Sequence, residues 1–304
     1  MDTVRIIGAP TDYGSDRRGV DMGPSTIRYA GLAETIESLG VECLDAGDLL
    51  VPRAERRDPD ASSVEGDAKH LRETEEVCRR LADEVAAAVG GESVPVVLGG
   101  DHSVGIGTLA GAGRDATIGT VWFDAHGDFN TPATTPSGNV HGMPLAAALG
   151  MGAFEDMDWA RSPGLHESNV VHVGLRSVDD RERDLIRESS GTAFTMSDID
   201  ERGVAEVTRE AIEIAADGVD ALHVSLDLDW LDPNVAPGVG TPVRGGATYR
   251  EAHTAMEIVA EYDDRFDLLR SFEVVEVNPV LDSHNETADV AAELAGSALG
   301  RRVL

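Results

Sequence analysis

The sequence contains almost no lysine. Lys69 is the only one in 304 residues, and 25 basic residues against 56 acidic ones give a formal net charge of −31. Nucleic acids and anionic membranes would repel such a chain, so we expect neither as a partner. Because the chain also has 41% hydrophobic residues, we favour a folded protein with an acidic surface adapted to high salt over a disordered acidic chain.

Cysteines and long apolar runs are scarce too. Cys43 and Cys78 stand outside any CxxC pattern, which argues against a disulfide framework and against a cysteine-based metal site. No run reaches about eighteen apolar residues, the length that spans a membrane, and the first residues have the pattern of a strand and not that of a signal peptide. We therefore expect a cytoplasmic protein that does not cross a membrane.

Strand and helix patterns alternate along the whole chain. Strands are expected at residues 4–8, 41–44, 94–98, 118–123, 170–175, 192–196, 221–226 and 269–277. Helices are expected at residues 24–39, 67–89, 180–188, 204–216, 249–260 and 286–299, with a short one from Pro144, a helix cap at Ser103 and a surface loop at 50–66. This alternation predicts βαβ units, hence an α/β fold with a parallel sheet. Since no repeat or linker divides the chain, residues 1–304 are expected to form a single domain.

Three of the strand patterns end in acidic residues or histidine. The residues in question are His102 after the third pattern, Asp124, His126 and Asp128 after the fourth, and Asp227 and Asp229 after the seventh. Alternate residues of a strand share one face, and the carboxyl ends of parallel strands are where α/β sheets build ligand sites. Buried charges are unfavourable unless they are compensated. We therefore predict that these six residues bind metal.

The donor types indicate which metal and which chemistry. Four carboxylates and two imidazoles without a thiolate favour Mn²⁺ before Mg²⁺ or Zn²⁺. Two ions about 3.5–4 Å apart can hold and deprotonate one water, which predicts hydrolysis. Glu276 ends an otherwise apolar strand pattern, where it could hold a cationic substrate. Asp101 and Asp232, beside the predicted ligands, are assigned to the shaping of loops and turns.

These elements resemble the metal motifs of the ureohydrolase family, which agmatinases share. They read GGDHS at residues 99–103, DAHGD at 124–128 and SLDLD at 225–229. Residues 18–25, 130–144 and 232–242 resemble the arginase branch in particular. The resemblance extends from about Ile6 to the C-terminus. It implies a three-layer α/β/α fold around an eight-stranded parallel sheet, and a homo-oligomer, either a trimer or a hexamer.

The resemblance also implies how two Mn²⁺ ions and the substrate would be held. His102 and Asp128 would bind one ion, His126 and Asp229 the other, and Asp124 and Asp227 would bridge them. A hydroxide between the ions would attack the guanidinium carbon of L-arginine, which yields L-ornithine and urea. In this scheme Asp128 steadies the intermediate, Glu276 pairs with the guanidinium, and His141 transfers the proton, a task suited to a histidine because its unperturbed pKa of about 6.5 lies near working pH.

The same resemblance indicates which residues would select arginine over agmatine. Asn130, Thr135 and Ser137 match positions that hold the α-carboxylate of arginine, which agmatine lacks, and Asp179, Glu182 and Thr241 match positions around the α-amino group. Three alternatives stay open: a ureohydrolase acting on agmatine or another guanidino substrate, a metal-dependent deacetylase of similar architecture, and a non-catalytic acidic protein that binds cations.

Two positions depart from the family pattern. Trp230, beside Asp229, stands where family members generally carry a small residue, and Arg244 stands where an apolar residue is usual. For Trp230 two consequences are considered: its ring could crowd the metal, or it could change packing at an interface.

Overall fold

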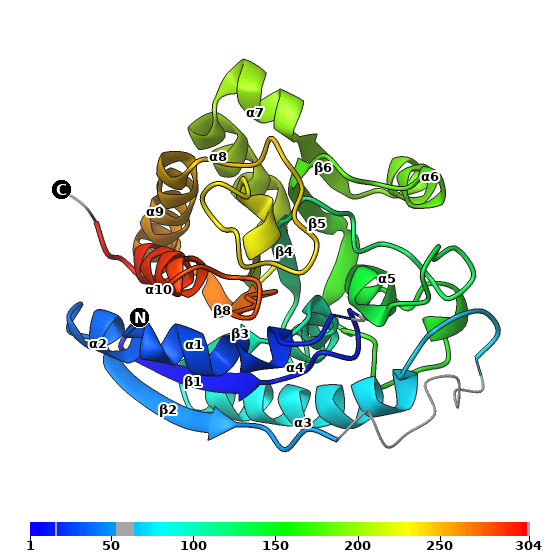
Figure 1. Cartoon of the computed structure of the whole chain (residues 1–304), viewed down its shortest axis with the longest axis horizontal. Helices are drawn as coiled ribbons and strands as arrows, with labels where there is room; N and C mark the ends of the chain where they lie inside the picture. The colour runs from blue at the N-terminus through cyan, green and yellow to red at the C-terminus, as the bar shows by residue number, and fades with distance from the viewer. Residues whose placement is uncertain (16, 53–63, 303–304) are drawn as a thin grey trace.

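The computed structural model describes residues 1–15, 17–52 and 64–302. Within these residues one sheet of eight strands runs in the order β2-β1-β3-β8-β7-β4-β5-β6, and every neighbouring pair is parallel (Figure 1). The strands are β1 Thr3–Ala9, β2 Glu42–Asp48, β3 Val94–Gly99, β4 Ile118–Phe123, β5 Leu165–Leu175, β6 Thr192–Thr195, β7 Ala221–Asp227 and β8 Leu269–Val275. The predicted α/β fold with an eight-stranded parallel sheet is confirmed.

Helices cover both faces of the sheet. They are α1 Gly23–Tyr29, α2 Leu32–Glu37, α3 Leu71–Gly90, α4 Gly105–Ala112, α5 Pro144–Ala148, α6 Asp180–Glu188, α7 Met196–Arg202, α8 Val204–Ala215, α9 Tyr249–Phe266 and α10 Glu286–Ala298. Val96 and Leu98 of β3 pack into the core formed with α1, α2 and α7 to α10, whereas Val97 packs into the core under α3, α4 and α5. Because side chains alternate along a strand, each central strand contributes to both cores, which gives three layers.

The four central strands end in register. Phe123 of β4 pairs with Leu226 of β7, Leu226 pairs with Val274 of β8, and Val274 pairs with Leu98 of β3. The residues that follow these four therefore leave the sheet along a single edge. The sheet topology thus brings together residues that are far apart in sequence, such as His102 and Glu276, which are 174 positions apart.

Some expectations about the helices were wrong. The helix expected at residues 24–39 is two helices, because Gly31 lies in the left-handed region (φ 86°) and interrupts it. Ser103 does not cap α4; instead Asp101 accepts a hydrogen bond from the Ser103 backbone N–H at 3.1 Å. Helix α7 was not expected at all. Of the loop expected at residues 50–66, residues 53–63 lie outside the described part of the chain.

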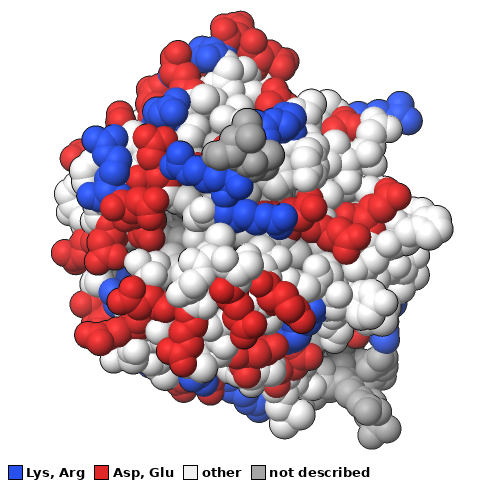
Figure 2. All heavy atoms as spheres, turned by 90° about the vertical axis from the view of Figure 1, so that its left-hand side faces the viewer, with Lys and Arg blue, Asp and Glu red and all other residues white. Residues whose placement is uncertain are grey.

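The surface carries the acidic excess. On the face that presents α9, α10 and the C-terminal end, acidic side chains surround a band of basic ones (Figure 2). Through the described residues we find no helix with the length and apolar character that a membrane crossing requires.

Candidate metal centre and substrate cavity

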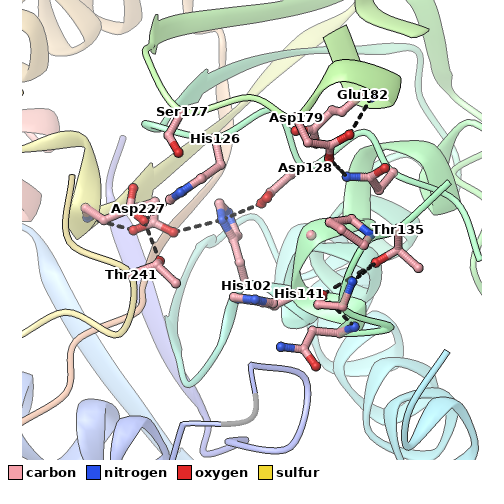
Figure 3. A pocket seen from close by; sticks show the side chains of 16 residues that line it. His102, His126, Asp128, Thr135, His141, Ser177, Asp179, Glu182, Asp227 and Thr241 are labelled. Atoms are coloured by element: carbon pink, nitrogen blue, oxygen red, sulfur yellow. Dashed lines mark hydrogen bonds and ion pairs between the residues drawn. The ribbon is translucent and has the colours of Figure 1, made fainter. Parts of the chain in front are cut away.

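A cavity of about 220 Å³ opens at the edge where the central strands end (Figure 3). Twelve of the fourteen predicted site residues line it: His102, His126, Asp128, Asn130, Thr135, Ser137, His141, Asp179, Glu182, Asp227, Asp229 and Thr241. The other two, Asp124 and Glu276, are each 1% exposed and do not line the cavity, although both contact residues that do. The structure thus gathers all fourteen in or directly beside one cavity.

Six of these residues form the innermost part of the site. His102 with Asp124 and Asp128, and Asp124 with His126 and Asp229, are two groups whose ligand atoms lie within 4.8 Å of one another. Asp124 belongs to both groups, as a bridging ligand would. Asp227 is in neither group, yet its Oδ2 lies 3.1 Å from Nδ1 of His102. Two adjoining ligand sets are therefore present.

Buried atoms in these groups lack hydrogen bonds. Nδ1 of His102, Oδ2 of Asp124 and Oδ2 of Asp128 have no hydrogen-bond partner among the described residues. Native proteins leave few such atoms without a partner, and a bound ion is one of the recognised reasons for them. The carboxylate and imidazole donors also suit a hard or borderline divalent cation. The residues present therefore fit two metal ions.

The protonation of the site agrees with this interpretation. Burial raises the pKa of Asp128 to about 6, assisted by the negative charge of Asp124. Burial alone would lower the pKa of His102. The nearby carboxylates of Asp128, Asp124 and Asp227 have the larger and opposite effect, and they raise that pKa well above its usual value. These shifts show that the carboxylates and the imidazole interact strongly, and divalent cations bound to such ligands would displace their protons.

Glu276 and His141 form a pair beside the metal ligands. Nδ1 of His141 lies 2.9 Å from Oε1 of Glu276, which also accepts the backbone N–H of His102 at 3.0 Å. Burial alone would lower the pKa of His141. The hydrogen bond to Glu276 and the negative charge of that residue have the larger effect, and the pKa is raised to about 9. Oε2 of Glu276 is buried without a hydrogen-bond partner among the described residues. That oxygen therefore has the capacity for a further hydrogen bond.

Two residues of the site have a strained backbone. Asp128 (φ 52°) and Glu276 (φ 64°) lie in the left-handed region that residues with a side chain rarely adopt. Such conformations persist where the surrounding structure over-determines them, and they cluster at functional sites.

The outer part of the cavity is polar. Asn130 donates from Nδ2 to Asp179 at 2.8 Å and accepts from the Thr134 hydroxyl at 2.8 Å, so its amide orientation is set. Asp179 also caps α6 by accepting the backbone N–H groups of Arg181 and Glu182. The Thr135 hydroxyl accepts the backbone N–H groups of Ser137 and Gly138, which shapes the loop at the rim.

Two residues assigned to the α-amino group have partners of their own. Oε1 of Glu182 accepts the Phe129 backbone N–H at 3.0 Å, and burial raises the pKa of Glu182 to about 8. Thr241 donates its hydroxyl to Oδ2 of Asp229 at 2.8 Å. Its oxygen remains able to accept a hydrogen bond, but its donor is used to hold a metal-ligand candidate.

The sequence reasoning missed four residues that line the cavity, namely Pro136, Asn139, Gly142 and Ser177. Ser177 follows β5, and its backbone N–H donates to the Ala125 carbonyl at 2.9 Å. The rule that ligand sites lie beyond strand ends, applied to β5 as well, could have found it. Asn139 and Gly142 lie within two positions of His141 in the sequence, so their proximity to it was the available signal.

Trp230 points away from the metal ligands. It is fully buried, packs edge-on against Phe123 at 4.9 Å between ring centroids, and belongs to the core under α8 and α9. Gly174 (φ 103°) makes room for it, because a Cβ there would lie 2.2 Å from Nε1 of Trp230. Trp230 does not line the cavity, so its ring does not crowd the metal site, and its side chain is buried within the chain. Arg244 is exposed, and nothing in the structure explains its identity.

Comparisons with known proteins agree with this geometry. The model of a family described as the arginase family matches residues 2–300. An arginase from Bacillus caldovelox is 46% identical over 307 aligned residues, with both chains covered completely. The crystal structure of arginase from Bacillus cereus superposes with a TM-score of 0.90 at 45% identity, covering 100% of each chain. An Entamoeba histolytica arginase in complex with L-ornithine has a TM-score of 0.87 at 30% identity, covering 99% of each chain.

Proposed function

Because the chain belongs to the arginase family, we propose that it hydrolyses L-arginine to L-ornithine and urea with two bound Mn²⁺ ions. One observation carries this proposal: two ligand groups that share Asp124 lie beside the unpartnered carboxylate oxygen of Glu276. A hydrolase of a guanidinium needs an activated water next to a fixed negative charge; metal held by the ligand groups would supply the first, and Glu276 would supply the second. The L-ornithine held by the Entamoeba histolytica arginase is the amino acid that this reaction would release.

The metal ligands are proposed as follows. His102 and Asp128 would hold one ion, His126 and Asp229 the other, with Asp124 shared and Asp227 beside His102. When bound, two Mn²⁺ ions would supply a water acidic enough to act as a nucleophile near neutral pH.

Glu276 and His141 would act on the substrate directly. Oε2 of Glu276 would accept hydrogen bonds from the guanidinium, which replaces the missing partner of a buried carboxylate and orients the carbon to be attacked. His141 has a pKa raised to about 9 by Glu276, so it is protonated at neutral pH and can give its proton to the leaving amine. Asp128 would accept a hydrogen bond from the intermediate.

The rim would select arginine over agmatine. Asn130, Thr135 and Ser137 would supply amide and hydroxyl groups for the α-carboxylate, while the carboxylates of Asp179, which lies beside Asn130, and Glu182 would face the α-ammonium. The orientation of the Asn130 amide is already set by Asp179 and Thr134. A substrate without the carboxylate would leave these polar groups without a partner, and such mismatches are penalised strongly.

Urea release from L-arginine and from agmatine, measured side by side with Mn²⁺ and molar KCl, tests the function. We expect urea from L-arginine only. Asn130→Ala should raise KM for L-arginine roughly tenfold, as the loss of one hydrogen bond to a charged group implies, and Thr254→Ala, on α9, serves as the control. Urea from agmatine alone would favour the alternative ureohydrolase, and no urea from either substrate would refute the proposal.

We also propose that residues 1–304 act as one domain and assemble into a trimer or hexamer. Support for one domain comes from the sheet, in which β3 pairs with both β1, near the start of the chain, and β8, near its end. Support for assembly comes from the family resemblance alone, and light scattering after size-exclusion chromatography would test it.

A further inference from the structure

Lys69 is the only lysine of the chain, and the proposed reaction gives it no role. It lies just before α3 and is half-buried. Its Nζ donates to Oδ1 of Asn139 at 3.3 Å, and Asn139 lines the substrate cavity. The ammonium group is therefore separated from the cavity by a single side chain.

Two backbone hydrogen bonds fasten the segment before α3 to the loop that carries Ser137. The Asp67 N–H donates to the Pro132 carbonyl, and the Lys69 N–H donates to the Gly138 carbonyl, both at 2.8 Å. A Cβ on Gly138 would lie 3.6 Å from both Cγ and Cε of Lys69, so the stem of the lysine runs along this loop. The segment thus holds the side chain of Lys69 next to the rim of the cavity.

The side chain of Lys69 adds something that these backbone bonds do not. Backbone hydrogen bonds of this kind can form with almost any residue, whereas the bond to Asn139 needs a donor at the end of a long side chain. Asn139 in turn donates from Nδ2 to the Ser15 carbonyl at 3.2 Å and from its N–H to the Ser137 hydroxyl at 3.1 Å. Lys69 therefore helps to fix the residue that orients the hydroxyl of Ser137.

The positive charge of Lys69 matters because the cavity beside it is acidic. None of the described residues that line this cavity is a lysine or an arginine, whereas five are carboxylates: Asp128, Asp179, Glu182, Asp227 and Asp229. Bound metal ions would compensate the inner carboxylates but not Asp179 in the outer part. The α-carboxylate of a ligand is repelled by negative charge and attracted by a cation held close to its binding groups.

We infer that Lys69 is a specificity-determining residue, whose charge beside Ser137 favours ligands that carry an α-carboxylate. Its hydrogen bond to Asn139 and the backbone bonds of its segment keep the charge in this place. The inference rests on the proposed function in that the α-carboxylate is taken to bind at Ser137.

Two ligands that differ only in the carboxylate test this inference. Putrescine is L-ornithine without its carboxylate, and the affinity of the Mn²⁺-loaded protein for each can be measured by isothermal titration calorimetry in the same KCl buffer. In Lys69→Met we expect L-ornithine to bind about fivefold more weakly, the upper range for a partly exposed charge pair. Putrescine should bind no more weakly, because it has no negative group to lose a partner. Lys69→Arg keeps the charge and should restore most of the affinity for L-ornithine.

Arg181→Met is the matched control. Arg181 is exposed and donates from Nη1 to the Ala133 carbonyl at 3.0 Å, so it contacts the same loop, but at a residue that does not line the cavity. The change removes one positive charge, as Lys69→Met does. Affinity for L-ornithine should stay within about twofold of wild type, a difference near the median for exposed charges.

Unchanged affinity for L-ornithine in Lys69→Met would overturn the inference. An equal loss for L-ornithine and putrescine would also overturn it, because it would show that Lys69 only supports the loop, and so would an equal loss in Arg181→Met. If Lys69→Met does not fold, Lys69→Gln takes its place with the same expectations. Failure of the proposed function is distinguishable, since it appears as Mn²⁺-loaded wild-type protein that binds L-ornithine yet releases no urea from L-arginine.

Discussion

Replacing Trp230 with alanine should weaken the fold while leaving substrate binding intact. The side chain is fully buried and packs edge-on against Phe123. A buried aromatic residue removes roughly 200 Å² from water, which at about 25 cal/mol per Å² is about 5 kcal/mol. Measured Trp→Ala losses run about 3–5 kcal/mol because the site relaxes in part. We therefore expect the free energy of unfolding to fall by about 4 kcal/mol.

Urea-induced unfolding of the metal-free protein, followed by circular dichroism at constant salt, measures this loss. Because Trp230 does not line the cavity, KM for L-arginine in the Mn²⁺-loaded variant should stay within about twofold of wild type, less than the effect of one lost hydrogen bond. A loss below about 1 kcal/mol would contradict the burial argument. A KM raised tenfold would show that the ring acts on the site after all.

Gly174→Ala supplies a second, independent check. Alone it should destabilise for two reasons: its Cβ would lie 2.2 Å from Nε1 of Trp230, and φ of 103° is unfavourable for alanine. In the Trp230→Ala background the clash disappears and only the backbone cost of about 1–2 kcal/mol remains. The double variant should therefore be more stable than the sum of the single losses predicts. Additive losses would refute the proposed packing of these two residues.

Three further predictions concern protonation, metal and salt. The pKa of His141 is raised to about 9 by Glu276, so this pair stabilises the metal-free protein fully below the unfolded pKa of about 6.5 and the stabilisation is lost as pH rises through about 9. His141→Asn should flatten that part of a plot of melting temperature against pH, and an unchanged slope would contradict the pairing. Mn²⁺ at 100 times its Kd should stabilise the protein by about 2.7 kcal/mol per site. Asp124→Asn, which alters both ligand groups, should remove most of this shift in a thermal melt; a full shift would exclude Asp124 as a ligand. Lowering KCl from 1 M to 0.01 M lengthens the Debye screening distance from about 3 to about 30 Å, so at a net charge of −31 the melting temperature should fall, and a constant value would refute adaptation to high salt.

The strands were predictable because their signal is local. All six residues of β4 are buried, and the apolar run that marks them is visible in the sequence without knowledge of any neighbour. The same holds for the gathering of Asp124 and Asp227, since parallel strands that end in acidic residues must place them at one edge. The order of the strands in the sheet could not be predicted in this way. No feature of the sequence around β8 indicates that this strand lies between β3 and β7.

The features that were missed depend on local geometry or on distant partners. Helix α7 begins with a capping box formed by Thr195 and Asp198, which was present in the sequence but was overlooked because the segment is short. The break at Gly31 depends on a left-handed backbone that a glycine permits but does not require. The fully buried carboxylate of Glu273 on β8 could not be told from an ordinary strand residue, because His223, 3.4 Å away, is on β7 and 50 positions distant in the sequence.

The place of β8 has a consequence for protein synthesis. Leu269–Val275 is the last strand to leave the ribosome, yet it lies in the middle of the sheet and joins β3 to β7. A nascent chain that ends before it can form only two separate sheets, β2-β1-β3 and β7-β4-β5-β6. His102 follows the first sheet, while the five acidic and histidine ligands from β4 and β7 follow the second. An incomplete chain therefore cannot assemble the full ligand set, and it exposes two sheet edges that can pair with other chains and promote aggregation.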